Sequence, residues 1–192
     1  MEKAVAMSHL FKRFSLLLLL VFMFAGCVST SILTDWRDPG FKGTFKKVLV
    51  ICNLHDSLAR TTLEDDLAAQ FTNRGIEAVQ SNVHFASLRD VDREMVRRKV
   101  REIDADGVLL IQPYDSKINI YESYPGWDAY FGLPDQPLTA ETYRVHISLF
   151  EAANGKVVWQ AISETMIGGG WMDTLKKFAK AMGTKLIEHR LI

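Results

Sequence analysis

The segment Lys47-Val-Leu-Val-Ile-Cys-Asn53 is apolar at every position between its two ends. A run of this length predicts a β-strand, and the absence of polar alternation is typical of a strand that is covered on both faces. A helical pattern follows at residues 56–73, and a second, short strand at residues 76–80. Strand, helix and strand in this order predict a parallel pair joined by a right-handed crossover.

The helix predicted at residues 56–73 supplies an apolar face to cover this strand. Its start has two interpretations, a capping box at residues 61–64 or a cap one turn earlier at Asp56 or Ser57. Gly75 is placed to end the helix. The apolar stripe consists of Leu63, Leu67 and Phe71.

Further along the chain, the pattern predicts another helix, a run of strands and a C-terminal helix. Asn154-Gly155, between the last two strands, is a type I′ hairpin signal. The order β-α-β-α-β-β-β-α predicts an α/β (α+β) fold: one mixed sheet, parallel in its first half and an antiparallel meander in its second, with helices packed on it. The expected elements are a helix at 87–103, a strand at 108–114 that continues at 117–121 past an irregularity near Pro113, strands at 141–151 and 156–165, and a helix at 173–190.

The N-terminal residues predict export from the cell. Residues 14–24 are apolar except for Ser15 and follow a basic segment. A helix of this length spans about 17 Å, too short for a bilayer core of about 30 Å, so the pattern favours a signal peptide with a start at Met1 or Met7. An ordinary cleaved signal or an uncleaved anchor helix is the alternative to a lipoprotein signal.

Ala25-Gly26-Cys27 resembles the lipobox of bacterial lipoproteins, in which the Cys is lipidated and becomes the mature N-terminus; Phe24 departs from the Leu that is usual before it. Val28, rather than Asp, favours the outer membrane under lipoprotein sorting rules. We therefore predict a protein held to the membrane by lipid on Cys27 and facing the periplasm. The predicted regions are a signal peptide at residues 1–26, a lipidated tether and entry segment at 27–43, with 28–34 as the tether itself, and a single periplasmic α/β domain at 44–192.

Composition excludes several classes of function. Lys and Arg number 23 against 23 Asp and Glu, and a formal net charge of zero argues against a nucleic-acid-binding protein. The two cysteines are too few for a disulfide scaffold or a zinc finger. Cys52 lies in the apolar strand and is expected to be buried and inert. No second His or Cys stands at ligand spacing to His55, so we expect neither a metal nor a cofactor.

Several short segments resemble a family of uncharacterised bacterial lipoproteins. The resemblance covers essentially the whole mature chain and implies a lipid-anchored envelope domain, with no activity to carry over. The layout is also similar, more distantly, to the curli secretion lipoprotein and the N-terminal domain of TolB. The shared segments are a Trp-x-Asp-Pro entry at residues 36–39, a Glu-Asp pair at 64–65 in the first helix, Gly-Ile-Glu-Ala at 75–78, and the strings at 105–109 and 155–159.

Polar residues follow the predicted parallel strands. Asn53 and His55 come after the first strand, and Gln112 and Tyr114 stand at the end of the third. Because the carboxyl ends of parallel strands line the ligand crevice in α/β folds, these four residues are candidates for a ligand cleft. The plainer interpretation is a capped helix with a surface His.

Three other features have a structural interpretation beside a functional one. Glycines 168–170 before the last helix fit a connector better than an anion-binding nest. The basic run at residues 97–101 fits a solvated helix face, and otherwise an anionic envelope surface. The carboxylates Glu64, Asp65 and Asp66 are expected on an ordinary helix face.

Residues 121–137 are unusually rich in aromatic side chains, prolines and glycines. Loops of this length inside a compact domain are often functional, and exposed aromatic residues are common anchors in protein interfaces. The alternative is that the rings fold back and pack against the sheet. The partner-binding candidates are Tyr121, Tyr124, Trp127, Tyr130 and Phe131.

The sequence thus favours a non-enzymatic envelope lipoprotein that contacts an envelope protein through the aromatic loop, without nucleic acid. The alternative is a small-ligand carrier or sensor that uses the cleft at the strand ends. No Gly-x-Ser-x-Gly motif is present, and the local spacing pairs no nucleophile with a base, which disfavours a hydrolase.

Overall fold

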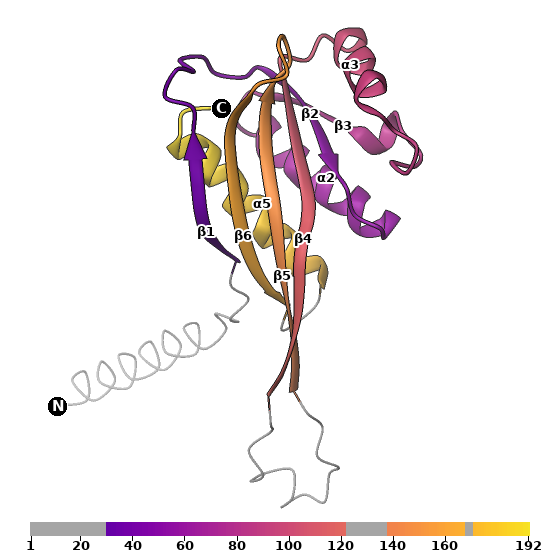
Figure 1. Ribbon diagram of the computed structural model, residues 1–192, viewed down its shortest axis with the longest axis vertical. Coiled ribbons are helices and arrows are strands. Elements are labelled where there is room, and N and C mark those ends of the chain that lie inside the picture. Colours follow the sequence, from indigo (N-terminus) through magenta and orange to yellow (C-terminus); the bar gives the residue numbers. More distant parts are fainter. Residues whose placement is uncertain (1–29, 122–137, 168–170) are drawn as a thin grey trace, which may run out of the picture.

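The computed structural model describes residues 30–121, 138–167 and 171–192, which form one six-stranded mixed sheet with helices packed on it (Figure 1). The strand order across the sheet is β1-β6-β5-β4-β2-β3. In chain order the elements are β1 (Thr30–Arg37), β2 (Lys47–Cys52), α2 (Ser57–Thr72), β3 (Glu77–Gln80), a 3₁₀ turn η1 (Ser81–Val83), α3 (Arg93–Glu102), β4 (Gly107–Tyr121), β5 (Leu138–Glu151), β6 (Val157–Ile167) and α5 (Trp171–Glu188).

The parallel and antiparallel halves of the sheet are as predicted. β2 pairs in parallel with β3 and with β4. β4, β5 and β6 form the antiparallel meander. The irregularity expected near Pro113 is a register shift between Pro113 and Asp115 in the β4–β5 pairing. The mixed α/β fold is therefore confirmed.

The first strand was not expected. Residues 28–34 were predicted to be a tether, but Thr30–Arg37 forms an edge strand antiparallel to β6, with Thr30 opposite Thr165. Most side chains of β1 are exposed, and its register shifts after Ile32. The apolar alternation that indicates a half-buried strand is therefore missing from this part of the sequence.

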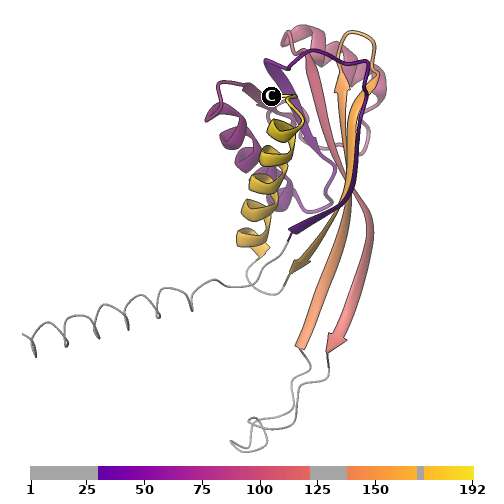
Figure 2. The ribbon, with the colours of Figure 1, turned by 90° about the vertical axis from the view of Figure 1, so that its left-hand side faces the viewer.

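The main core lies between the sheet and the helices α2 and α5, which cover one face (Figure 2). The predicted stripe of α2 is buried, and Trp159 of β6 is fully buried in the same core. Because successive residues of a strand point to opposite faces, Val48 and Val50 face this core while Leu49 and Ile51 face the other side of the sheet. The apolar run of β2 is thus covered on both faces, as predicted.

The helix α3 covers the other face and is shorter than the predicted 87–103. Asp92 is its N-cap, since Asp92 Oδ1 accepts a hydrogen bond from Met95 N at 2.7 Å. Ser87 instead accepts a bond within a turn. Only Val100 of α3 is buried, so the core on this face is small.

Two local predictions about turns and caps are corrected. The turn between β5 and β6 is not type I′, because that turn needs positive φ at both central residues. Gly155 has φ +70°, but Asn154 does not lie in that region, and Gly155 N donates to Glu151 O at 2.8 Å. The capping box at 61–64 is also wrong: Asp56 caps α2 one turn earlier, the alternative interpretation.

The strands β4 and β5 extend beyond the rest of the sheet as a two-stranded arm (Figures 1 and 2). β2 pairs with β4 only as far as Ile111, and β6 pairs with β5 only as far as Glu141. The pairing of β4 with β5 continues to Tyr121 opposite Leu138. We call residues 119–121 and 138–140 the arm end, because there the two strands pair with each other and with no other strand that the structure describes.

Candidate functional site

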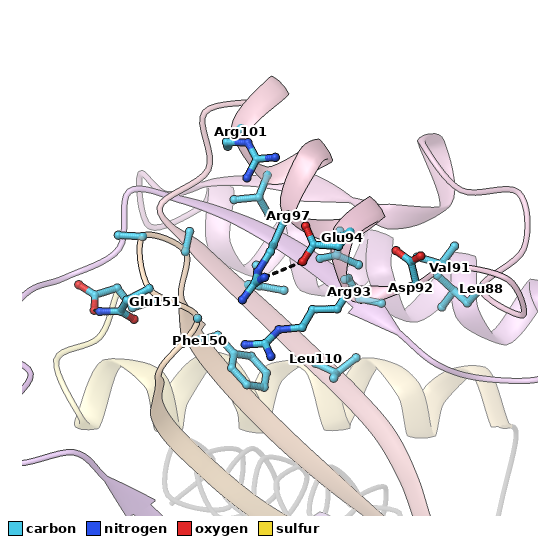
Figure 3. Close-up of a pocket in the computed structure, with 18 of the residues that line it drawn as sticks. Leu88, Val91, Asp92, Arg93, Glu94, Arg97, Arg101, Leu110, Phe150 and Glu151 are labelled. Carbon is cyan, nitrogen blue, oxygen red and sulfur yellow. Dashed lines mark hydrogen bonds and ion pairs between the residues drawn. The ribbon is translucent and has the colours of Figure 1, made fainter.

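The structure brings Asn53 and Gln112 together at the carboxyl ends of β2 and β4. Asn53 N donates to Ile111 O at 2.8 Å, which continues the parallel pairing by one residue. Both Asn53 and Gln112 line a cleft of about 830 Å³ between α3 and the sheet. We call it the α3 cleft; Figure 3 shows it from the side of α3.

His55 lies in a different cleft on the opposite face of the sheet. This second cleft, the α2–α5 cleft, has a volume of about 700 Å³ and is formed by the first turns of α2 and α5 and by β4 and β5. His55 itself is exposed. Tyr114 belongs to β4, but its side chain lies outside the described residues. The candidates predicted for one ligand cleft are therefore divided between two faces. After Asn53 the chain leaves the sheet and turns into α2, which covers the opposite face, and this places His55 on that side.

The α3 cleft has an apolar floor and a polar rim. Leu110 of β4 and Phe150 of β5 form part of the floor, and both are only half-buried (Figure 3). Arginines of α3 and the β5–β6 turn form the rim. The rim residues are Asp92, Arg93, Glu94, Arg97, Arg101, Glu151, Ala152, Ala153, Asn154 and Gly155.

The polar cluster that sequence reasoning missed lies inside the core. Glu64 is 0% exposed and Arg60 5% exposed, and Arg60 Nε donates to Glu64 Oε1 at 3.2 Å. The same oxygen accepts from Cys52 N at 3.0 Å and from Ser81 Oγ at 2.7 Å. Glu64 Oε2 accepts from Asn82 N at 2.7 Å.

This Arg60–Glu64 network occupies the crevice at the ends of β2 and β3, where many α/β proteins bind a ligand. Arg60 Nη2 also donates to Ser81 Oγ and to Phe85 O, each at 2.9 Å. Both oxygens of Glu64 are thus engaged, and the network joins α2 to the segment that follows β3. The expectation that Glu64 lies on an ordinary helix face is wrong. An Arg four residues before a Glu in a helix was the available sequence signal.

The only cysteine in the described part of the chain, Cys52, is buried as predicted. Burial raises the pKa of its thiol well above the ordinary value, and the nearby Glu64 carboxylate raises it further. A thiol that stays protonated is a poor nucleophile and a poor metal ligand.

The other predicted sites lie outside the described residues. These are the lipid-attachment candidate Cys27, the glycines 168–170 and the aromatic candidates beyond the backbone of Tyr121. Within the described part of the chain, no three residues of the types His, Cys, Asp and Glu stand close enough to hold a metal ion. No helix among residues 30–121, 138–167 and 171–192 has the length and apolar content needed to cross a bilayer.

Comparison with known proteins finds similar structures but no assigned family. No protein-family model and no curated protein matches the sequence. A PelC dodecamer from Paraburkholderia phytofirmans is 17% identical, with 82% of this chain and 96% of that chain covered and a TM-score of 0.46. The lipoprotein GNA1162 from Neisseria meningitidis is 15% identical over 74% of this chain and 98% of that chain, with a TM-score of 0.45. A minor lipoprotein from Acinetobacter baumannii is 10% identical over 76% and 95%, with a TM-score of 0.37. Similarity at this level assigns no function.

Proposed function

We propose that the protein is a lipid-anchored lipoprotein of the bacterial cell envelope that catalyses no reaction and acts by contacting an envelope protein. The anchor is supported by the short apolar run of residues 14–24 and by Cys27 directly behind its small residues. Val28 after this Cys favours the outer membrane, with the α/β domain facing the periplasm.

The observation that carries the contact proposal is the β4–β5 arm. At the arm end each strand has one edge that no other described strand pairs with, because β2 and β6 both stop before it. Two-stranded ribbons bury little apolar surface of their own and are marginally stable in isolation. An arm of this kind adds little to the core, and its free strand edges are suited to pairing with a partner.

The aromatic-rich segment is joined to both strands of the arm end. Tyr124, Trp127, Tyr130 and Phe131 all belong to residues 122–137, which lie outside the described residues. Aromatic side chains dominate the binding energy of many protein interfaces. Their position in the chain, directly after Tyr121 and before Leu138, supports the arm as the contact element.

Crosslinking in intact cells followed by pull-down tests the contact. Trp127→Ala combined with Tyr130→Ala is expected to abolish the crosslinked partner band. Trp36→Ala is the matched control, since Trp36 is a 45% exposed tryptophan on β1, away from the arm. Capture that survives the double substitution, or that is lost equally in Trp36→Ala, contradicts the proposal.

Metabolic labelling with a radioactive fatty acid tests the anchor separately. Cys27→Ser should remove the label, whereas Cys52→Ser should retain it because Cys52 is buried. Label that persists on Cys27→Ser overturns the lipoprotein assignment. Fractionation of inner and outer membranes then tests the expected outer-membrane location.

A further inference from the structure

The α3 cleft is a gap in the smaller core. Val100 is the only residue of α3 that is buried, and Leu110 and Phe150 on the facing strands remain half-buried. A well-packed helix–sheet contact leaves few voids larger than a water molecule. The cleft measures about 830 Å³, which lies within the range of roughly 300–1,000 Å³ that is typical of small-molecule sites.

The carboxylates on the rim of the α3 cleft are already engaged. Asp92 caps the helix through Met95 N. Glu94 Oε1 accepts from Arg97 Nη1 at 2.6 Å. Glu151 accepts from the side-chain amide of Asn154.

Two of the guanidinium groups on the rim, by contrast, have no acceptor among the described residues. Within the described part of the chain, Arg93 and Arg101 form neither an ion pair nor a side-chain hydrogen bond. Figure 3 shows Arg93 and Arg97 extending from α3 toward the sheet, with the guanidinium end of Arg93 drawn beside Phe150, while Arg101 lies farther along the helix. The cleft therefore combines an apolar floor with unpaired cationic donors above it.

We propose that the α3 cleft binds a small organic anion with an apolar body, such as a carboxylate that carries an aromatic or aliphatic tail. The anionic head would pair with the guanidinium group of Arg93, beside that of Arg97, because a guanidinium presents two parallel donors to a carboxylate. The tail would cover Leu110 and Phe150. This proposal depends neither on the lipid anchor nor on the arm, so its failure leaves both untouched.

Isothermal titration calorimetry on the full chain in a nonionic detergent tests the site with three probes of similar size. They are 4-phenylbutyrate, 4-phenylbutanol and 4-phenylbutylamine, which share the phenyl-alkyl tail and carry an anionic, a neutral and a cationic head group. Saturable binding of the carboxylate is expected, about tenfold tighter than binding of the alcohol, with no binding of the amine. Equal affinity for carboxylate and alcohol, or no saturable binding of the carboxylate, overturns the proposal.

Variants on α3 locate the binding. Arg93→Gln should weaken the affinity for 4-phenylbutyrate about tenfold, and Ala153→Trp should block binding by filling the cleft rim. Arg98→Gln is the matched control, because Arg98 is an exposed arginine of the same helix that does not line the cleft. An equal loss in Arg98→Gln, or undiminished binding in both cleft variants, contradicts the assignment to this cleft. Because all three positions are exposed, the thermal midpoints should match that of the parent.

Discussion

Glu64 forms a buried hydrogen-bond network that the sequence pattern did not predict. Its carboxylate accepts from two backbone N–H groups, one hydroxyl and one guanidinium, all within the core. Removing one partner of a buried ion pair leaves an uncompensated charge, which costs far more than the pair itself contributes. In this protein the stranded group would be Arg60, which is 5% exposed.

Glu64→Ala is therefore expected to lower the free energy of unfolding by about 3–5 kcal/mol, measured by urea-induced unfolding. Asp65→Ala is the matched control on the same helix, because Asp65 is exposed, and it should stay within about 0.5 kcal/mol of the parent. A loss for Glu64→Ala no larger than that of the control would mean that water or a rearranged Arg60 replaces the network.

Asp66 is expected to change the pH dependence of stability in the direction opposite to that of an ion-paired carboxylate. Burial raises its pKa, and Asp65 raises it further, while Lys176 opposes both. An acid whose folded pKa is raised destabilises the folded state when it is ionised, and this penalty disappears as the pH falls through the raised value. Asp66→Asn should thus increase the thermal midpoint at neutral pH, and the gain should shrink on acidification. A gain that grows toward low pH, or one equalled by Asp65→Asn, would contradict this origin.

At the scale of the elements, the cap of α3 is expected to matter because few residues of this helix are buried. Only Val100 is buried, so the hydrogen bond from Met95 N to Asp92 is a substantial part of what stabilises the helix. Asp92→Ala is expected to cost about 1 kcal/mol and to speed amide hydrogen exchange in α3 more than in α2. Asp90→Ala, at an exposed position two residues earlier, should leave the stability and the amide exchange rates of α3 unchanged. Amide exchange that speeds up equally in all helices would indicate global rather than local destabilisation.

Asp106 and Gly107 hold the start of β4 against the start of β2. Asp106 accepts hydrogen bonds from Lys46 N at 2.8 Å and from Lys47 N at 2.9 Å. A Cβ at Gly107 would stand only 2.6 Å from the ring of Phe45. The string at residues 105–109 that resembles the lipoprotein family therefore has a structural explanation: a carboxylate that joins two strands and a glycine that admits a ring.

At the scale of the whole molecule, two other segments of that resemblance meet in space. Asp38 of the Trp-x-Asp-Pro entry accepts from Gly40 N at 2.9 Å and pairs with Lys156 Nζ at 2.5 Å. Lys156 belongs to the string at residues 155–159, which ends in the buried Trp159. The motifs therefore connect the entry segment to the β5–β6 hairpin, which explains why they predict a fold and not a chemistry.

The sequence predicted the parts of the molecule whose side chains follow a clear period. The apolar run of β2 and the stripe of α2 both lie where the pattern placed them. Sequence reasoning missed β1 because an exposed edge strand needs little apolar alternation, and it extended α3 too far because the turns before Asp92 have a helix-like composition. The cleft candidates were wrongly grouped into one site, because only their position at the strand ends was considered and not the face of the sheet on which each one lies.

The arm and the body of the molecule are expected to be separable. At the arm end, β4 and β5 pair with each other and with no further described strand, whereas Glu141 already pairs with Ile167 of β6. Deleting residues 119–140 and joining Ile118 to Glu141 through Asn-Gly, a favoured two-residue hairpin turn, should leave cooperative thermal unfolding and its midpoint nearly unchanged. The same deletion should abolish the crosslinked partner band, since it removes the proposed contact element. A large drop in the midpoint would instead show that the arm belongs to the folding unit, and retained crosslinking would move the contact surface to the body.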